Sequence, residues 1–339
     1  MKEMKTTPQQ TEGTETKSKK ALGDKMKAIV IHNFGDGNVL QQEEVTIPKI
    51  EQDDILVKVQ AAGINPIDWK VRQGYREDFL QNNNPGILGW DVAGTVIEVG
   101  DLVTRFKPGD KIYANPSAAR NGAYAEYIAI RSYEAALVPK SISVTEAAGV
   151  PLAAQTAWTG LFDKANLKAD QKVLIHGASG GVGTFAVQLA KIAGAYVIGT
   201  CSKTNIDMVK SIGADQVIDY KNEDFSTKLK NIDVVLDTIG GDTQVKSLKV
   251  LKAGGILVST VGINAAEKSP RPDVKTIGYY SIGNGAKLAE IGGLIEKGLI
   301  KIIIDRTFPL ENVREAHQLS ETHHAKGKII LTIDQKTNG

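Results

Sequence analysis

The stretch at 172–203, which reads KVLIHGASGGVGTFAVQLAKIAGAYVIGTCSK, constrains the fold more than any other part of the chain. Its apolar start predicts a buried parallel strand, which runs into a turn with four glycines. Apolar side chains then recur at helical spacing, and a second apolar strand is expected at 195–200. Glycines let the backbone approach a ligand closely, and the first amides of the helix can hold a pyrophosphate. The stretch therefore predicts a dinucleotide site, with backbone contacts from Gly180, Gly181 and Val182, rather than an ordinary βα turn.

The residues after the second strand indicate which dinucleotide binds. An NAD-specific site usually places an acid about 20 residues after the first glycine. In this chain Ser202, Lys203 and Asn205 occupy that region, and the first acid is Asp207, inside the next expected helix. Hydroxyl, ammonium and amide groups can all donate to a 2′-phosphate. The sequence therefore predicts NADP(H), with Ser202, Lys203 and Asn205 on the phosphate. The alternative is that Lys203 is only a solvated side chain at a helix start.

Composition excludes several other classes of protein. The chain has 339 residues, 42% of them hydrophobic and 24% charged, which is ordinary for a globular protein with room for two cores. Its net charge of +2 equals the excess of six lysines over four acids in the first 25 residues. The rest is about neutral, so neither a nucleic-acid partner nor a membrane is expected. The one cysteine, Cys201, predicts a reducing compartment, and we expect a cytoplasmic protein. Residues 1–24 lack an apolar core and are expected to be a disordered extension, so that a chain starting at Met26 would be complete.

Two patterns of expected structure divide the chain. Short strands that alternate apolar and polar residues, separated by Gly and Pro, predict a compact, barrel-like β domain in the first part. Further on the order becomes strand–helix–strand, which predicts a doubly wound parallel sheet, with a Pro-containing loop at 269–276. Strand character returns near the C-terminus. The predicted fold is therefore α/β, with a Rossmann sheet at 149–284 inserted into a discontinuous β domain at 25–148 and 285–339.

Seven short segments, in order along the chain, carry a resemblance to known proteins: GINPIDWK at 63–70, LGWDVAGTV at 88–96, GAYAEY at 122–127, PLAAQTAW at 151–158, HGASGGVG at 176–183, GADQVIDY at 213–220 and HAKGKIIL at 324–331. On these segments the chain resembles the medium-chain dehydrogenase/reductase superfamily. Within it, the chain is similar to the zinc-free quinone oxidoreductase and enone reductase branch. The resemblance implies that the β domain is GroES-like and that the protein is a homodimer, joined through the edge of the nucleotide-domain sheet.

The resemblance also bears on metals and chemistry. The superfamily's zinc enzymes place Cys and His where this chain has Asn65 and Trp90, and they carry a four-cysteine loop that this sequence lacks. Its five histidines are not at ligand spacing, so no metal is predicted. Without zinc to polarise an alcohol oxygen, an activated double bond is the easier hydride acceptor. The resemblance implies NADPH-dependent reduction of small quinones or enones, with hydride transfer to the β-carbon of an enone. The alternatives are an NADPH-binding structural, sensing or RNA-binding protein, and an alcohol dehydrogenase.

Further site residues follow from the resemblance. Asn65 is expected near the nicotinamide ribose and the substrate oxygen, although it could simply cap the helix that begins at Pro66. Lys70 is expected to stabilise an enolate oxygen, the alternative being a solvated lysine, and either Lys70 or water would supply the proton. Asp68 is expected to be structural. The remaining expected contacts are to the cofactor, from Thr156, Tyr220, Gly240, Val261 and Lys328, and to the substrate, from Tyr75, Trp90 and Tyr279, where aromatic residues are otherwise simply core.

Overall fold

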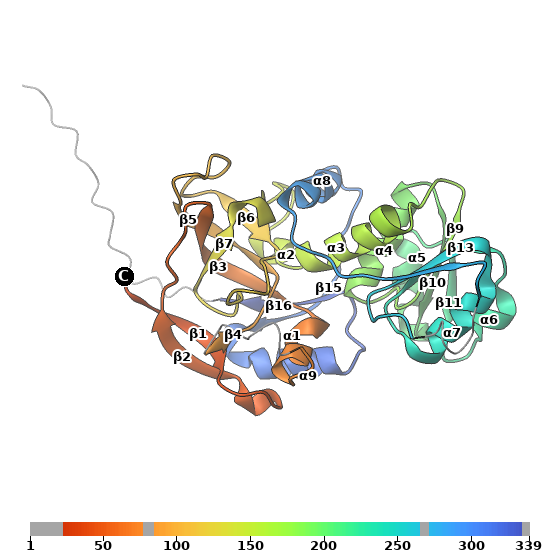
Figure 1. The fold of residues 1–339 in the computed structure, drawn as a ribbon, viewed down its shortest axis with the longest axis horizontal. Coiled ribbons are helices and arrows are strands. Elements are labelled where there is room, and N and C mark those ends of the chain that lie inside the picture. The colour runs from red at the N-terminus through yellow and green to blue at the C-terminus, as the bar shows by residue number, and fades with distance from the viewer. Residues whose placement is uncertain (1–22, 77–84, 265–270, 334–339) are drawn as a thin grey trace, which may run out of the picture.

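The computed structural model describes residues 23–76, 85–264 and 271–333. Figure 1 shows two lobes side by side: a mostly stranded lobe that holds both ends of the described chain, and a lobe that holds the glycine-rich stretch. The described part contains nine α-helices, which are α1 (Pro66–Arg72), α2 (Val144–Ala147), α3 (Pro151–Trp158), α4 (Gly181–Ile192), α5 (Ile206–Ser211), α6 (Phe225–Lys228), α7 (Gly241–Val250), α8 (Gly285–Glu296) and α9 (Val313–Glu321).

Two sheets form the first lobe, and their strands are β1 (Lys25–Ile31), β2 (Gln41–Thr46), β3 (Asp54–Ile64), β4 (Gly86–Ile87), β5 (Val92–Val99), β6 (Lys111–Ala114), β7 (Tyr127–Arg131), β8 (Ala135–Leu137), β15 (Ile304–Pro309) and β16 (Lys328–Thr332). The smaller sheet has the order β2-β1-β4. The larger has the order β15-β16-β3-β5-β6-β8, with β7 paired to β3. Strand β16 pairs antiparallel with β3, so that Ile330 lies opposite Gly63. One sheet thus contains strands from both ends of the chain, which confirms the predicted discontinuous β architecture.

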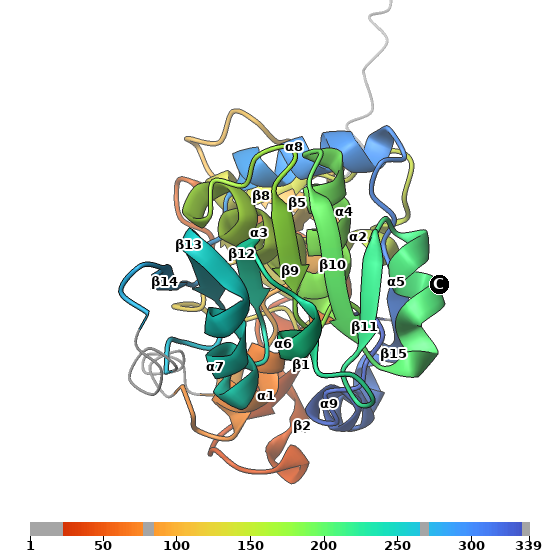
Figure 2. The ribbon, with the colours of Figure 1, turned by 90° about the vertical axis from the view of Figure 1, so that its right-hand side faces the viewer.

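The second lobe is built on one parallel sheet, seen from its side of the molecule in Figure 2, with strands β9 (Lys172–Ile175), β10 (Tyr196–Cys201), β11 (Gln216–Asp219), β12 (Ile232–Asp237), β13 (Leu251–Ser259) and β14 (Lys275–Gly278). The order is β11-β10-β9-β12-β13-β14, and each neighbouring pair is parallel. In sheets of this kind the ligand binds outside the carboxyl ends of the strands, where the strand order reverses. That point lies between β9 and β12, and β9 leads into the glycine-rich turn.

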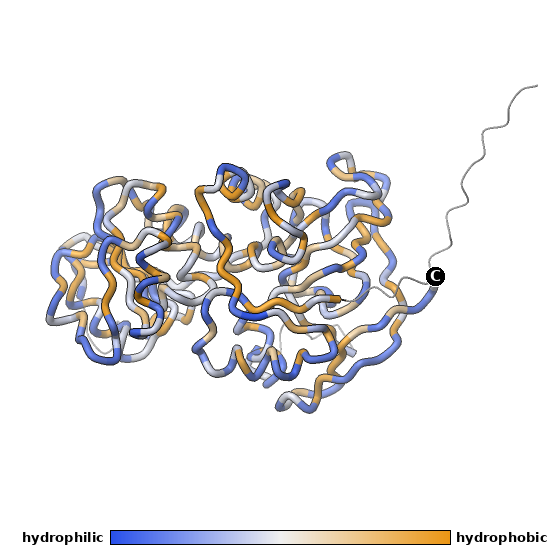
Figure 3. Tube along the Cα trace, turned by 180° about the vertical axis from the view of Figure 1, so that it is seen from behind, coloured by the Kyte–Doolittle hydropathy of each residue, from blue (hydrophilic) through white to orange (hydrophobic). Residues whose placement is uncertain are grey.

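Apolar residues join the two lobes. One buried cluster contains Ala61 and Ile330 of the large first-lobe sheet together with residues of α3, β9 and β12. Figure 3 shows hydrophobic segments following the strands, whereas many outer loops are hydrophilic. Among the described residues, none of the helices combines the length and the apolar character needed to cross a membrane.

Some details differ from the expectation drawn from sequence. The last two residues of the expected loop at 269–276 belong to strand β14, and its residues 269 and 270 lie outside the described residues. Strand β2 carries little sequence signal, because its residues QQEEVT are mostly polar and it lies at a sheet edge. The expected extension at 1–24 lies almost wholly outside the described residues. The domain limits at 148 and 285 remain predictions.

Candidate active site

The glycine-rich turn between β9 and α4 is shaped for close backbone approach. Gly177 has φ +67°, in the left-handed region, and a Cβ on Gly183 would lie 2.1 Å from the Gly177 carbonyl oxygen. Helix α4 begins after Gly180, which has no side chain that could cap the first amides of the helix. The amides of Gly181 and Val182 therefore have no carbonyl one turn earlier to accept them. Amides at the positive end of a helix dipole fit a dinucleotide pyrophosphate, and Gly327, which pairs with Gly180 in a parallel bridge, lies beside the first of them.

Three other expected cofactor residues lie at the carboxyl edge of the same sheet. Gly240 follows β12 with φ +78°, and a Cβ there would lie 3.0 Å from Val261 Cγ2, just after β13. Tyr220 follows β11, and half of its side chain is exposed. Its amide donates to the carbonyl of Cys201, the last residue of β10, at 3.2 Å. The structure thus brings Gly240 and Val261 into contact and places Tyr220 at the far end of this edge.

The segment after β10 lies beside the glycine turn. Asn205 Nδ2 donates to Ser179 Oγ at 3.2 Å and to Ser202 Oγ at 3.3 Å. Lys203 is exposed. The acid at the end of the neighbouring strand, Asp219, is buried and accepts hydrogen bonds within its own turn. The end of β10 therefore presents hydroxyl, amide and ammonium donors.

A buried polar cluster, formed by Asn65, Asp91 and Lys328, lies on the first-lobe side of the turn. The Lys328 ammonium is 2.9 Å from Asp91 Oδ2, 2.5 Å from Asn65 Oδ1 and 3.1 Å from the carbonyl oxygen of Ile64. Asn65 Nδ2 donates to Asp91 Oδ2 at 2.9 Å, and the Leu152 amide donates to Asp91 Oδ1 at 2.6 Å. Burial raises the pKa of the Asp91 carboxyl, and Lys328 opposes this rise. The amide of Asn65 is therefore held in one orientation, and we refer to these three residues as the lysine cluster.

The lysine cluster touches the glycine turn. A Cβ on Gly181 would lie 3.1 Å from Lys328 Cδ. The preceding residue, Gly327, donates its amide to the Ser179 carbonyl at 2.8 Å and pairs with Gly180 in a parallel bridge. Lys328 thus lies with its stem against the turn and its ammonium directed into the first lobe, where it is almost wholly buried.

A second chain of buried hydrogen bonds fixes the start of α1. The backbone N–H of Asn65 and the Tyr124 hydroxyl donate to Asp68 Oδ2 at 2.8 and 2.7 Å. Arg72 Nη1 lies 3.1 Å from His317 Nδ1, and because an arginine can only donate, Nδ1 must be the acceptor. The proton of the His317 ring is therefore on Nε2, which donates to Tyr124 Oη at 3.2 Å. Burial raises the pKa of Asp68 to about 7 and lowers the pKa of His317 to about 3. These hydrogen bonds connect α9 to α1 and support a structural role for Asp68.

Lys70 lies on α1, the helix that begins directly after Asn65. Its ammonium is 5.5 Å from the centre of the Trp69 ring, and the side chain is half-buried. Burial lowers the pKa of this ammonium. A half-buried lysine is a stronger electrostatic partner for a developing anion than a fully solvated one.

The aromatic residues expected in the substrate pocket separate in the structure. Tyr279 is 5% exposed, and its hydroxyl donates to the carbonyl of Thr156 at 3.0 Å. Trp90 is 1% exposed and belongs to the first-lobe core. Both side chains thus pack in the core, which is the alternative given for them above, and a place beside the substrate remains a prediction for them. Tyr75 is 71% exposed, and so is Tyr280, the residue after Tyr279.

Asp91 and Tyr280 are absent from the residues proposed from sequence. Asp91 did carry a signal, because a carboxylate inside the apolar run LGWDVAG must find a partner when that run is buried. Tyr280 has no comparable signal. Choosing between two adjacent tyrosines requires knowing which of them faces the core.

Metal-ligand chemistry is sparse in the part of the chain that the structure describes. No three His, Cys, Asp or Glu side chains there gather in an arrangement able to hold a metal ion. His176 is buried between Thr200 and Ser247 at hydrogen-bond distance, and burial lowers its pKa to about 4. Asn65 and Trp90 are not zinc-ligand types.

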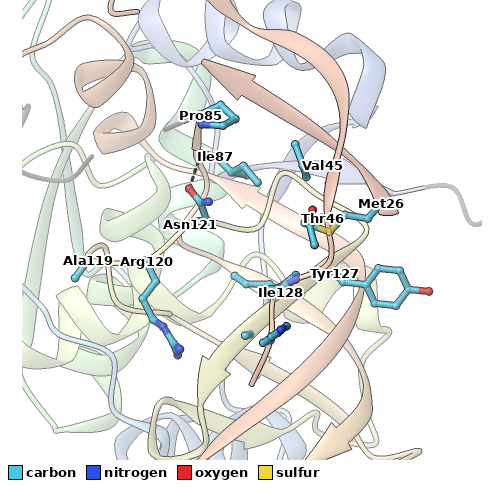
Figure 4. A pocket seen from close by; sticks show the side chains of 14 residues that line it. Met26, Val45, Thr46, Pro85, Ile87, Ala119, Arg120, Asn121, Tyr127 and Ile128 are labelled. Carbon is cyan, nitrogen blue, oxygen red and sulfur yellow. Dashed lines mark hydrogen bonds between the residues drawn. The ribbon is translucent and has the colours of Figure 1, made fainter. Parts of the chain in front are cut away.

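A separate cavity of about 310 Å³ lies in the first lobe, between β1, β2, β4 and β7. Figure 4 shows Met26, Ile87, Asn121 and Ile128 around it, with the Ile87 amide donating to Asn121 Oδ1 at 2.9 Å. Its lining includes neither the lysine cluster nor the glycine turn.

Comparison with known proteins agrees with this geometry. Residues 51–140 match the alcohol dehydrogenase GroES-like domain, and residues 212–331 match the zinc-binding dehydrogenase family. The chain is 34% identical to the mitochondrial NAD(P)H oxidoreductase RTN4IP1 of Danio rerio over 92% of each chain. It is 37% identical to the chloroplastic NADPH-dependent alkenal/one oxidoreductase of Arabidopsis thaliana, over 92% of this chain and 80% of the relative.

Among solved structures, the quinone oxidoreductase from Coxiella burnetii superposes with a TM-score of 0.86 at 35% identity, over 91% of this chain and all of the other. The matches span both lobes and agree with the dinucleotide-binding sheet. The chain belongs to the medium-chain dehydrogenase/reductase superfamily of nicotinamide-dependent oxidoreductases and, within it, to the quinone oxidoreductase branch.

Proposed function

We propose that the protein is an NADPH-dependent reductase of quinones or α,β-unsaturated carbonyls that works without zinc. The observation that carries this proposal is the contact between the glycine turn and the lysine cluster, through the stem of Lys328. Because the two touch, a dinucleotide bound along the turn would run toward Asn65 and α1. An acceptor would then bind between the nicotinamide and that helix. The named relatives act in the same class of chemistry, as an alkenal/one oxidoreductase and a quinone oxidoreductase.

The choice of NADPH rests on the end of β10. Ser202 and Asn205 are linked to Ser179 of the turn, and Lys203 is exposed beside them. A 2′-phosphate there would meet donors, whereas an NAD-specific site would present a carboxylate to the ribose hydroxyls.

Zinc independence rests on the donor set. An amide and an indole stand at Asn65 and Trp90, where the superfamily's zinc enzymes carry ligands, and the Asn65 amide is bound to Lys328 and Asp91. The positive charge next to Asn65 comes from the Lys328 ammonium. A metal is therefore not needed to balance the buried Asp91 carboxylate.

In the proposed reaction the acceptor gains a hydride and a proton. NADPH, when bound, supplies the hydride and becomes NADP⁺; an enone receives it at the β-carbon, and a quinone is reduced to the hydroquinone. The amides of Gly181 and Val182 would hold the pyrophosphate, and the lysine cluster would keep the start of α1 in place. The Lys70 ammonium would stabilise the enolate oxygen until the α-carbon takes a proton from Lys70 or water.

The less favoured alternatives are an alcohol dehydrogenase and an NADPH-binding structural, sensing or RNA-binding protein. The first would need a group to polarise the alcohol oxygen, and the second leaves the half-buried Lys70 without a use. A homodimer through the sheet edge and a cytoplasmic location remain predictions of the sequence. The Danio rerio and Arabidopsis thaliana relatives are named as mitochondrial and chloroplastic proteins.

The proposal can be tested by measuring steady-state oxidation of NADPH with 9,10-phenanthrenequinone, a simple enone and a 2-alkenal as acceptors. A secondary alcohol with NADP⁺ tests the alcohol dehydrogenase alternative. We expect turnover of a quinone or enone and none of the alcohol. Tight NADPH binding without turnover of any acceptor would favour the binding-protein alternative.

A further inference from the structure

We propose that Tyr75, Arg76 and Tyr280 form a clasp that recognises planar aromatic acceptors. The proposal rests on the function proposed above and names its substrate class. The Arg76 guanidinium lies 5.3 Å from the centre of the Tyr280 ring, which joins the end of α1 to the segment after β14. Tyr75 and Tyr280 are each 71% exposed, although most large hydrophobic side chains of the described chain are covered.

The position of these residues places them at the acceptor side of the site. Helix α1 starts at Asn65 and has seven residues, so it spans about 10 Å. The Tyr75 amide donates to the Lys70 carbonyl at 2.9 Å, which holds Tyr75 at the end of this helix. Tyr280 comes two residues after β14, at the carboxyl edge of the parallel sheet, where ligands of such sheets bind. The clasp therefore spans the two lobes within about one short helix of the lysine cluster.

The chemistry of the clasp favours one class of acceptor. A quinone ring is planar and electron-poor, so it stacks well on an electron-rich phenol ring. The guanidinium has five N–H donors in one plane and can donate to a quinone or aryl-ketone oxygen while lying against an aromatic face. A short aliphatic alkenal has no ring to stack and gains little from either residue. Quinones and aryl enones should therefore be preferred to aliphatic alkenals.

Two variants test this preference. We expect Tyr280→Ala to lower kcat/KM for 9,10-phenanthrenequinone by a factor between about 2 and 13, since a stacked aromatic pair contributes about 0.5–1.5 kcal/mol beyond its burial. Arg76→Gln should cause a loss of similar size. For 2-hexenal, an aliphatic alkenal without a ring, both variants should remain within about twofold of the parent. Tyr196→Ala is the matched control, because Tyr196 is a partly exposed tyrosine at the start of strand β10, and the proposed cofactor site lies at the carboxyl end of that strand.

A binding arm separates this inference from the proposed function. Calorimetric titration of 9,10-phenanthrenequinone into the NADP⁺-loaded protein measures recognition without hydride transfer. Weaker binding of the quinone to Tyr280→Ala, with unchanged binding to Tyr196→Ala, would support the clasp. This holds even if the parent protein turns over no acceptor, because that result would overturn only the proposed function. If the parent turns over both acceptors and Tyr280→Ala loses both equally, or loses neither, the proposed function stands and the clasp is wrong.

Discussion

The ammonium of Lys328 lies 2.9 Å from Asp91 Oδ2, and the exposed fractions of the two side chains are 3% and 0%. Lys328 begins β16, the last strand of the described chain, which lies in the large first-lobe sheet, and Asp91 immediately precedes β5. Because the stem of Lys328 also rests against Gly181, this ion pair connects the acceptor side of the site to the nucleotide turn. The pair is thus both a structural joint and part of the proposed active site.

Breaking this pair should cost much more stability than breaking an exposed one. Lys328→Met leaves a buried carboxylate without its partner, and we expect the free energy of unfolding to fall by about 3–5 kcal/mol. Adding Asp91→Asn to Lys328→Met should recover part of the loss, because the unpaired charge is removed. Urea denaturation measures both changes. The control is Lys246→Met, which removes an exposed ion pair with Asp224 of nearly the same length, 2.8 Å, and should have a much smaller effect. Equal losses for Lys328→Met and Lys246→Met would contradict this reading.

The buried Asp68 should make stability depend on pH in a defined direction. Burial raises its pKa from 3.8 to about 7, so the folded protein holds a proton that the unfolded chain has already lost between about pH 4 and pH 7. Its contribution to stability is full below pH 4 and is lost as the pH rises through about 7. Stability of the parent relative to Asp68→Asn should therefore fall across this interval. Burial lowers the pKa of His176 and His317, so these two side chains act in the opposite sense, but both are present in the parent and in Asp68→Asn. A flat or rising difference in denaturation midpoints would show that Asp68 is ionised in the folded protein at all these values.

Cofactor choice should depend on the end of β10. Lys203→Glu places a carboxylate where the 2′-phosphate would bind, so NADPH should bind about 10–100-fold more weakly, the value of one charge-assisted hydrogen bond. NADH binding should change little. Lys210→Glu introduces the same charge change at an exposed position on α5 and serves as the control. Fluorescence titration with each cofactor provides the test, and equal loss of NADPH affinity in the two variants would assign the effect to overall charge.

Lys70 should affect the chemical step more than cofactor binding. Lys70→Met removes the positive charge proposed for the enolate oxygen and should lower kcat about 100-fold with an unchanged Kd for NADPH. Lys70→Arg should restore part of the rate. Because burial lowers the pKa of Lys70, kcat/KM of the parent should fall as the pH rises through that lowered value, and this fall should be absent in Lys70→Arg. If Lys70→Met keeps the parental rate, the proton and the enolate stabilisation come from elsewhere.

The parts of this molecule set by local pattern could be predicted from the sequence. The glycine spacing of 177–183 and the apolar strand before it lead directly to the turn, α4 and the parallel sheet, because each depends on neighbouring residues. The return of strand character after residue 300 was enough to predict a discontinuous β domain. Lys328 could be placed near the cofactor only by resemblance to relatives.

What the sequence could not supply is the pairing of residues far apart in the chain. The partner of Lys328 is 237 residues away, and that of Arg72 is His317, 245 residues away. Local periodicity contains no information on such contacts. Which of the adjacent Tyr279 and Tyr280 faces the core could not be predicted for a related reason, since it depends on register, and a shift of one residue reverses it.

The most direct test of the proposed chemistry is the fate of the hydrogen at C4 of the nicotinamide. The protein would be incubated with NADPH carrying two deuterium atoms at C4 and a simple enone in ordinary water, and the product would be examined by NMR and mass spectrometry. We predict one deuterium at the β-carbon and a solvent hydrogen at the α-carbon. A reduced product without deuterium at the β-carbon, or no reduced product from enone or quinone despite bound NADPH, would contradict the account.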